Sequence, residues 1–163
     1  MSVPDSTAVS SSTASPSTVG FEQSLAIAIE APALAVLDYV SNPQTWPQWM
    51  PATHEIISDD RPLQQDETFS ERWVTRKGEV GLAWSVTKRE DPTLWQAECE
   101  TPFTGPIVAC YEVEVTGPSS CIYTRRIINP ARPKAPTGEM IERMDAEARL
   151  CLDNIKRVVE SVS

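Results

Sequence analysis

Two charged residues of this chain occupy positions where a β-strand would turn side chains toward a hydrophobic core. Glu71 lies between two aromatic residues, Phe69 and Trp73, and Arg126 lies two residues before Ile128. Because alternate side chains of a strand share a face, each charge would point inward with its apolar neighbours. A lone buried charge is costly, so an inward charge needs a partner or a wet pocket. The pattern therefore indicates a candidate acid–base site.

The same charges have an alternative interpretation as ordinary cross-strand ion pairs on the solvent face. Glu71, Arg125 and Arg126 would then all contact water. Adjacent Arg125 and Arg126 point to opposite faces of a regular strand, so one of them faces inward unless a bulge intervenes. The sequence leaves open which one does.

Tyr111 and the only histidine, His54, complete the candidate catalytic set. In this hypothesis Glu71 or His54 moves protons, while Arg126 and Tyr111 stabilise an enolate-like oxygen. A lone histidine at a loop-to-strand junction is more often structural than catalytic. No second histidine or closely paired cysteine is available for a metal, and no serine lies in a GxSxG motif. We therefore expect neither a metal site nor a cofactor.

A second group of residues would form the wall of a pocket. The five tryptophans offer flat faces on which a planar aromatic ligand could stack, although core packing explains most of them equally well. We predict Trp73 and Trp84 as pocket walls, with Trp46 and Trp49 bracing short helices at its mouth. The predicted lining comprises Trp73, Trp84, Trp95, Ala97, Cys99, Ala109, Tyr123, Thr124 and Met144.

Alternating apolar patterns and turn signals predict the elements that position these residues. A strand over Phe21–Glu30 precedes a helix from Pro32 to about Val40 and a brief helix within Pro43–Met50. The following strand-like runs have short separators, which favours an antiparallel meander. These runs are Thr53–Ser58, Thr68–Thr75, Val80–Arg89, Leu94–Thr101, Ile107–Thr116 and Cys121–Ile128.

A long amphipathic helix is predicted after the proline-rich segment Pro130–Pro136. Its apolar residues recur at steps of three and four, so they share one face that must pack on the sheet. They are Met140, Met144, Ala148, Cys151, Ile155, Val158 and Val162. One sheet and one closing helix predict an α+β domain over residues 20–163.

Charge and composition exclude several classes of partner. The chain has 163 residues and a formal net charge of −9, and no Lys or Arg precedes Arg61. Nucleic acid and anionic membranes need a basic surface, so we expect to find neither as a partner. No apolar run is long enough to span a membrane, and a secretory signal pattern is lacking, which favours a cytoplasmic location. The Ser/Thr/Pro-rich residues Met1–Val19 are expected to form a disordered tail.

The four cysteines have neither CxxC spacing nor the density of a disulfide-stapled protein, so we expect free thiols. For the assembly we expect a monomer or a homodimer.

The order of elements, with three short motifs, resembles the START/polyketide cyclase superfamily, also called SRPBCC or helix-grip proteins. The motifs are Ala31-Pro32 before a helix ending in Asp38-Tyr39-Val40, the turn Trp46-Pro47-x-Trp49, and Leu82-x-Trp84-x-Val86 leading to Asp91-Pro92. The resemblance covers roughly Phe21–Val162. It implies a curved antiparallel sheet of about seven strands around a C-terminal helix, with two short helices after the first strand.

The resemblance also implies a hydrophobic ligand held in a cavity between sheet and helix. Members of the superfamily include polyketide aromatases and cyclases, lipid-transfer modules, hormone-binding proteins and a few lyases, and fold alone does not choose among them. Our leading hypothesis is a protein that encloses a small aromatic or polyketide-like molecule; if it is an enzyme, it is a cyclase or dehydratase. The alternative is a non-catalytic carrier or sensor of a lipid or quinone-like ligand. A third hypothesis is a regulatory module whose acidic N-terminal third meets a basic partner.

Overall fold

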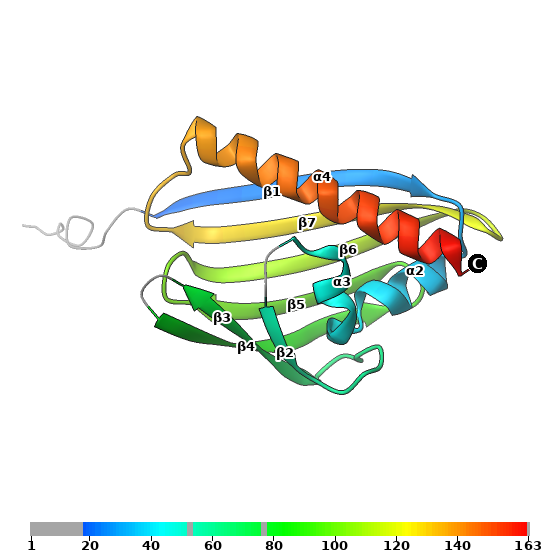
Figure 1. Cartoon of the computed structure of the whole chain (residues 1–163), viewed down its shortest axis with the longest axis horizontal. Helices are drawn as coiled ribbons and strands as arrows, with labels where there is room; N and C mark the ends of the chain where they lie inside the picture. The colour runs from blue at the N-terminus through cyan, green and yellow to red at the C-terminus, as the bar shows by residue number, and fades with distance from the viewer. Residues whose placement is uncertain (1–17, 52–53, 76–77, 163) are drawn as a thin grey trace, which may run out of the picture.

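The computed structural model describes residues 18–51, 54–75 and 78–162. Apart from its last two residues, the tail predicted over Met1–Val19 lies outside this part of the chain. The described chain forms one curved sheet crossed by a long helix, with two short helices beside that helix (Figure 1). No helix of these residues is long and apolar enough to span a membrane.

The described residues form seven strands, which pair antiparallel in the order β1-β7-β6-β5-β4-β3-β2. This arrangement confirms the predicted helix-grip architecture. In chain order the elements are β1 (Val19–Ile29), α2 (Ala33–Val40), η2 (Pro43–Thr45), α3 (Trp46–Trp49), β2 (His54–Ile57), β3 (Thr68–Thr75), β4 (Gly78–Glu90), β5 (Leu94–Thr101), β6 (Gly105–Gly117), β7 (Ser120–Arg132) and α4 (Gly138–Ser161).

Helix α4 buries one face against the sheet, as its spacing predicts. Its first turn is capped by the Thr137 hydroxyl, which accepts from the Met140 amide at 3.1 Å. The predicted face is wrong at its C-terminal end, where Val162 is exposed and Val159 is buried instead. The helix ends at Ser161, so Val162 no longer continues the helical face. The buried residues are Ala148, Cys151, Leu152, Ile155 and Val159.

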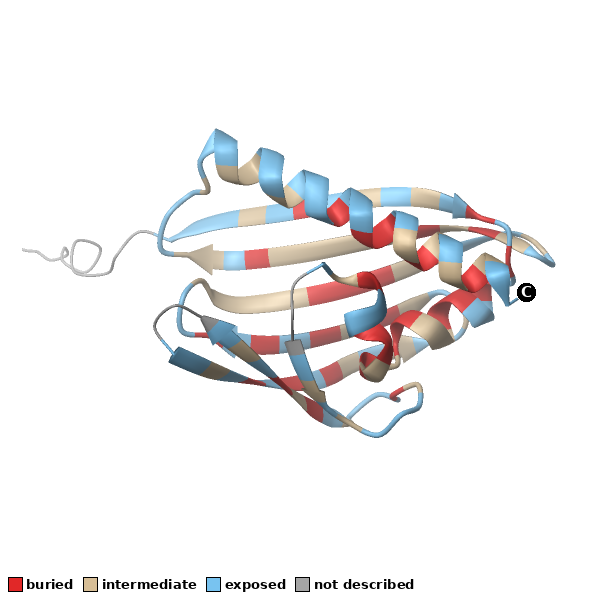
Figure 2. Ribbon diagram, in the orientation of Figure 1, coloured by how far each residue is buried: buried red, intermediate tan, exposed pale blue. Residues whose placement is uncertain are grey.

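An aromatic cluster fills the space beneath α2, α3 and the C-terminal half of α4. Trp46, 2% exposed, lies at its centre, with ring centroids 5.3 Å from Phe69 and 5.8 Å from Trp84. Its indole N–H donates to the Val40 carbonyl at 3.0 Å. Trp46 and Trp49 are thus core residues rather than the braces at a pocket mouth that we predicted. Figure 2 shows buried residues concentrated at this end of the molecule.

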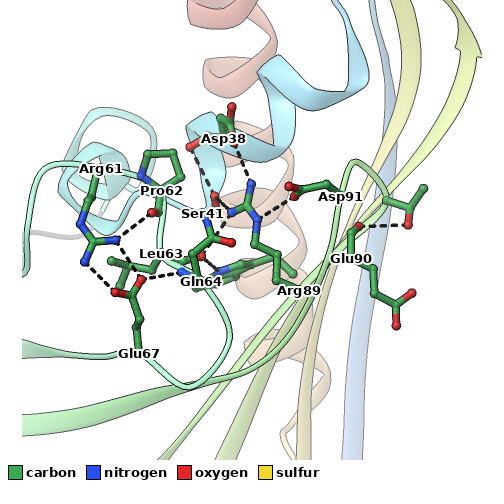
Figure 3. A network of polar contacts seen from close by, with 12 residues as sticks. Asp38, Ser41, Arg61, Pro62, Leu63, Gln64, Glu67, Arg89, Glu90 and Asp91 are labelled. Atoms are coloured by element: carbon green, nitrogen blue, oxygen red, sulfur yellow. Dashed lines mark hydrogen bonds and ion pairs between the residues drawn. The ribbon is translucent and has the colours of Figure 1, made fainter.

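Arg89 ties three segments together beside the cluster (Figure 3). Its side chain is 4% exposed and pairs with Asp38 of α2 and with Asp91, each at 2.7 Å. It also donates to the Ser41 hydroxyl at 2.7 Å and to the Leu63 carbonyl at 3.2 Å. The network fixes α2 and the segment before β3 on the end of β4.

The four cysteines are buried free thiols, as expected. Burial raises the pKa of each thiol, that of Cys99 to about 12. Since the thiolate is the reactive form, we expect native protein to react slowly with Ellman's reagent and all four thiols to react in urea. Rapid reaction of one native thiol would contradict this placement.

Candidate ligand-binding site

A cavity of about 320 Å³ lies between the N-terminal half of α4 and the concave face of β1, β6 and β7. It occupies the end of the molecule away from the aromatic cluster, beneath the orange part of α4 in Figure 1. Its wall is formed by Gln23, Met50, Pro51, Trp73, Phe103, Thr104, Ile107, Arg125, Ile127, Asn129, Arg132, Met144, Glu147, Ala148 and Cys151.

Much of this wall is apolar and part of it is flat. The Trp73 and Phe103 rings stack with centroids 6.0 Å apart and planes 13° apart. Met50 and Met144 add flexible thioether side chains that adapt to irregular shapes. Such walls suit a small, mostly apolar molecule with planar parts.

Arg125, not Arg126, is the arginine that lines the cavity on β7. Arg126 is 31% exposed and pairs on the outer face with Glu22 of β1 at 3.0 Å and Glu112 of β6 at 3.5 Å. These two flanking carboxylates hold Arg126 outside. Thr124 shares that outer face by strand alternation. The predicted inward positions of Arg126 and Thr124 are therefore wrong.

Two carboxylates, Glu71 and Glu147, act on the same neighbours as Arg125, namely Tyr111 and Cys151, without pairing with it. Within residues 18–51, 54–75 and 78–162, no carboxylate lies within ion-pair distance of its guanidinium, and its buried Nε has no hydrogen-bond partner. Its cross-strand neighbour is Tyr111, and the hydroxyls of Tyr111 and Tyr123 are likewise buried without a hydrogen-bond partner in the described chain. Burial raises the pKa of both tyrosines, an effect that the nearby Arg125 charge only partly offsets. Both hydroxyls therefore stay neutral.

Two amide side chains accompany Arg125 on the cavity floor. Asn129, 3% exposed, follows Arg125 at the second inward position along β7. Gln23 of β1 pairs in register with Ile127, between the two, and its Nε2 donates to Asp145 at 2.9 Å. Sequence reasoning named Arg126 and Thr124 rather than Arg125 and Asn129, because it favoured the even-numbered residues of β7 as inward, although it left open which arginine faces the cavity. It did not consider Gln23 of β1.

Glu71 is buried, 2% exposed, and accepts from the Trp84 indole N–H at 3.0 Å. Neither Glu71 nor Tyr111 is among the residues that line the cavity. The predicted convergence of Glu71, Tyr111 and Arg126 is thus not formed, since Arg126 lies on the opposite face of the sheet. The backbone of His54 pairs with Trp73 in β2, and its side chain lies outside the described part of the structure.

Of the predicted wall residues, Trp73 and Met144 line the cavity. The others, apart from Thr124, face the interior but are not cavity residues, because they pack within the hydrophobic core. These buried residues are Trp84, Trp95, Ala97, Cys99, Ala109 and Tyr123. Among the described residues, no group of three His, Cys, Asp or Glu side chains could hold a metal ion.

Comparison with known proteins places this fold in a family. The profile described as "Polyketide cyclase / dehydrase and lipid transport" matches residues 18–160. The chain belongs to this family. No curated protein matches the sequence significantly.

Solved structures share the fold at low sequence identity. A START superfamily protein from Mycobacterium smegmatis has a TM-score of 0.63 and 17% identity, with 87% of this chain and 99% of that chain covered. The di-domain ARO/CYC StfQ from the steffimycin biosynthetic pathway has a TM-score of 0.66 and 10% identity, with 87% and 51% covered, so this chain spans about half of it. Norcoclaurine synthase from Thalictrum flavum has a TM-score of 0.60 and 15% identity, with 90% of each chain covered. Family and fold together support binding of a hydrophobic ligand.

Proposed function

We propose that this protein binds a small aromatic or polyketide-like molecule in the cavity between α4 and strands β1, β6 and β7, acting as a carrier or sensor. The observation that carries the proposal is the cavity itself, about 320 Å³ with mostly apolar walls and a few polar groups on its floor. Ligand sites combine these features, since apolar walls supply affinity and scattered polar groups fix orientation.

The positions of the acidic residues favour ligand binding without catalysis. Glu71 accepts from Trp84 and is not a cavity residue, so it is poorly placed to reach a ligand. Among the described cavity residues Glu147 is the only carboxylate, and it is exposed. A general acid or base must lie within hydrogen-bond reach of the proton that it transfers.

Cyclisation or dehydration is a second candidate function, favoured by Arg125. A guanidinium without a carboxylate partner in a largely apolar cavity would stabilise an enolate-like oxygen. Adding a linear poly-β-ketone to the ligand-free protein separates the two functions. A cyclase or dehydratase raises the rate at which dehydrated, cyclised product appears by mass spectrometry above the rate without protein, and Arg125→Met removes that gain, whereas a carrier leaves the rate unchanged.

Narrowing the cavity should weaken binding. Ala148 is a buried cavity residue of α4, whereas Ala146 on the same helix is exposed. We expect Ala148→Phe to reduce affinity for the neutral fluorescent probe N-phenyl-1-naphthylamine at least about tenfold, or about 1.4 kcal/mol. The matched control Ala146→Phe should bind like the wild type. Equal binding by both variants, each with a native melting curve, would place the probe outside this cavity.

A further inference from the structure

We propose that the ligand carries a carboxylate or an equally acidic oxygen group, bound by Arg125, and a second polar group toward Asn129. The inference rests on the proposed function and adds the chemical class of the ligand. It depends on three polar side chains that the sheet places around Ile127 on the cavity floor.

The first observation is the uncompensated charge of Arg125. Its neighbour Arg126 pairs with two carboxylates on the outer face, whereas Arg125 has no ion-pair partner in the described chain. Arg125 is partly buried and its Nε is fully buried, so part of the guanidinium has lost water without gaining an anion, and a bound carboxylate would accept two parallel N–H bonds from it. Arg125 thus has the charge and donor geometry for an acidic ligand group.

The side chains nearest to Arg125 do not supply the missing negative charge. Burial raises the pKa of Tyr111, Tyr123 and Cys151, so all three are neutral at physiological pH. The cavity carboxylate Glu147 lies on α4 and forms no ion pair with Arg125. The charge of Glu71 also acts on Tyr111, but Glu71 is not a cavity residue, so among the described residues that line the cavity none forms an ion pair with Arg125. An anion bound in the cavity would therefore come from the ligand.

The second observation is Asn129, a cavity residue that is 3% exposed and has no hydrogen bond to the described chain. Its amide lines the cavity and can both donate and accept a hydrogen bond. Gln23, across from Ile127, uses its Nε2 on Asp145 and keeps its oxygen as an acceptor. These amides suit a ligand hydroxyl or carbonyl.

The positions of Arg125, Ile127 and Asn129 along β7 predict how the ligand is oriented in the cavity. Arg125 and Asn129 are four residues apart on one face, so their backbones are separated by roughly 13 Å, with Ile127 between them. Arg125 lies beside the fully buried Tyr111, whereas Asn129 lies toward the partly exposed Arg132. We therefore expect the acidic end of the ligand to enter first, with an apolar framework over Ile127 and a polar group nearer to the opening.

Calorimetric titration with matched naphthalenes tests the acidic group. Wild-type protein should bind 2-naphthoate at least about tenfold more tightly than neutral 2-naphthamide, as expected for charge-assisted hydrogen bonds. Arg125→Met should remove this preference by lowering the affinity for naphthoate much more than that for naphthamide, and Arg125→Lys should keep part of it. The matched control Arg126→Met removes the neighbouring arginine, which lies on the outer face of the sheet, and should leave the preference intact.

The polar group near Asn129 is tested with 6-hydroxy-2-naphthoate, whose hydroxyl and carboxylate lie at opposite ends of the rings. We expect the hydroxyl to improve binding to wild type and this gain to vanish in Asn129→Leu. Equal affinity for naphthoate and naphthamide, or the same loss in Arg125→Met and Arg126→Met, would overturn the carboxylate proposal. If neither naphthalene nor N-phenyl-1-naphthylamine binds, the proposed function fails as well.

Discussion

Trp46→Ala is expected to lower the free energy of unfolding by about 4 kcal/mol, within the range for large-to-small changes in well-packed cores. The Trp46 indole is almost fully buried, contacts Phe69, Trp84 and other rings, and donates to the Val40 carbonyl. Its removal leaves a cavity and an unpaired carbonyl in the centre of the aromatic cluster. Urea unfolding followed by circular dichroism measures the change.

Trp73→Ala is the matched control for this prediction. Trp73 is only partly buried and one side of it faces the cavity, so its removal should cost less stability. It should instead weaken binding of N-phenyl-1-naphthylamine, since the stacked wall with Phe103 is lost. If the two variants lose the same stability, the division of the interior into a filled and a hollow end is wrong.

Arg89→Met should lower the free energy of unfolding by about 3 kcal/mol. The arginine is buried, whereas Asp38 and Asp91 are about half exposed and can regain water, which limits the cost. The loss also leaves the Ser41 hydroxyl and the Leu63 carbonyl without this donor. Urea unfolding followed by circular dichroism measures this change in the free energy of unfolding.

Arg61→Met provides the control, because Arg61 forms ion pairs with Asp59 and Glu67 at an exposed site. Surface pairs contribute little to stability, so the urea midpoint should barely move. A larger effect at Arg61 than at Arg89 would mean that the network in Figure 3 does not hold α2 on β4.

Local patterns in the sequence predicted most of the fold. The strands Thr68–Thr75 and Leu94–Thr101 have the predicted bounds, because period-two alternation is sharp where one face packs on a core. Helix α2 begins directly after Pro32. A proline is tolerated at a helix N-terminus because the backbone N–H that it lacks would have no partner within the helix. The order of elements then limited the architecture to one sheet and a closing helix.

The site was harder to predict because it depends on strand register. The outer face of β7 is identified by Glu22 and Glu112, which lie on two other strands and flank Arg126 only once β1, β7 and β6 are paired. The available signal was the match between the positive charge of Arg126 and the carboxylates on the two neighbouring strands. It would have placed Arg126 on the outer face and therefore Arg125 on the inner face. The run Ile122 to Ile128 suggested the opposite parity.

The position of the cavity depends on how large side chains share volume. Five indoles could have lined a pocket, but Trp46, Trp49, Trp84 and Trp95 pack together and fill one end of the domain. Only packing in three dimensions determines that Trp73 is left facing the hollow end. A pattern of residue types carries no such information.

Native mass spectrometry of the protein purified from its own host tests most directly whether the cavity holds a small molecule. We expect a discrete mass excess over the 18.0 kDa chain that denaturation releases, that Ala148→Phe abolishes and that Ala146→Phe retains. A native chain with no added mass, which also fails to bind N-phenyl-1-naphthylamine, would contradict the account.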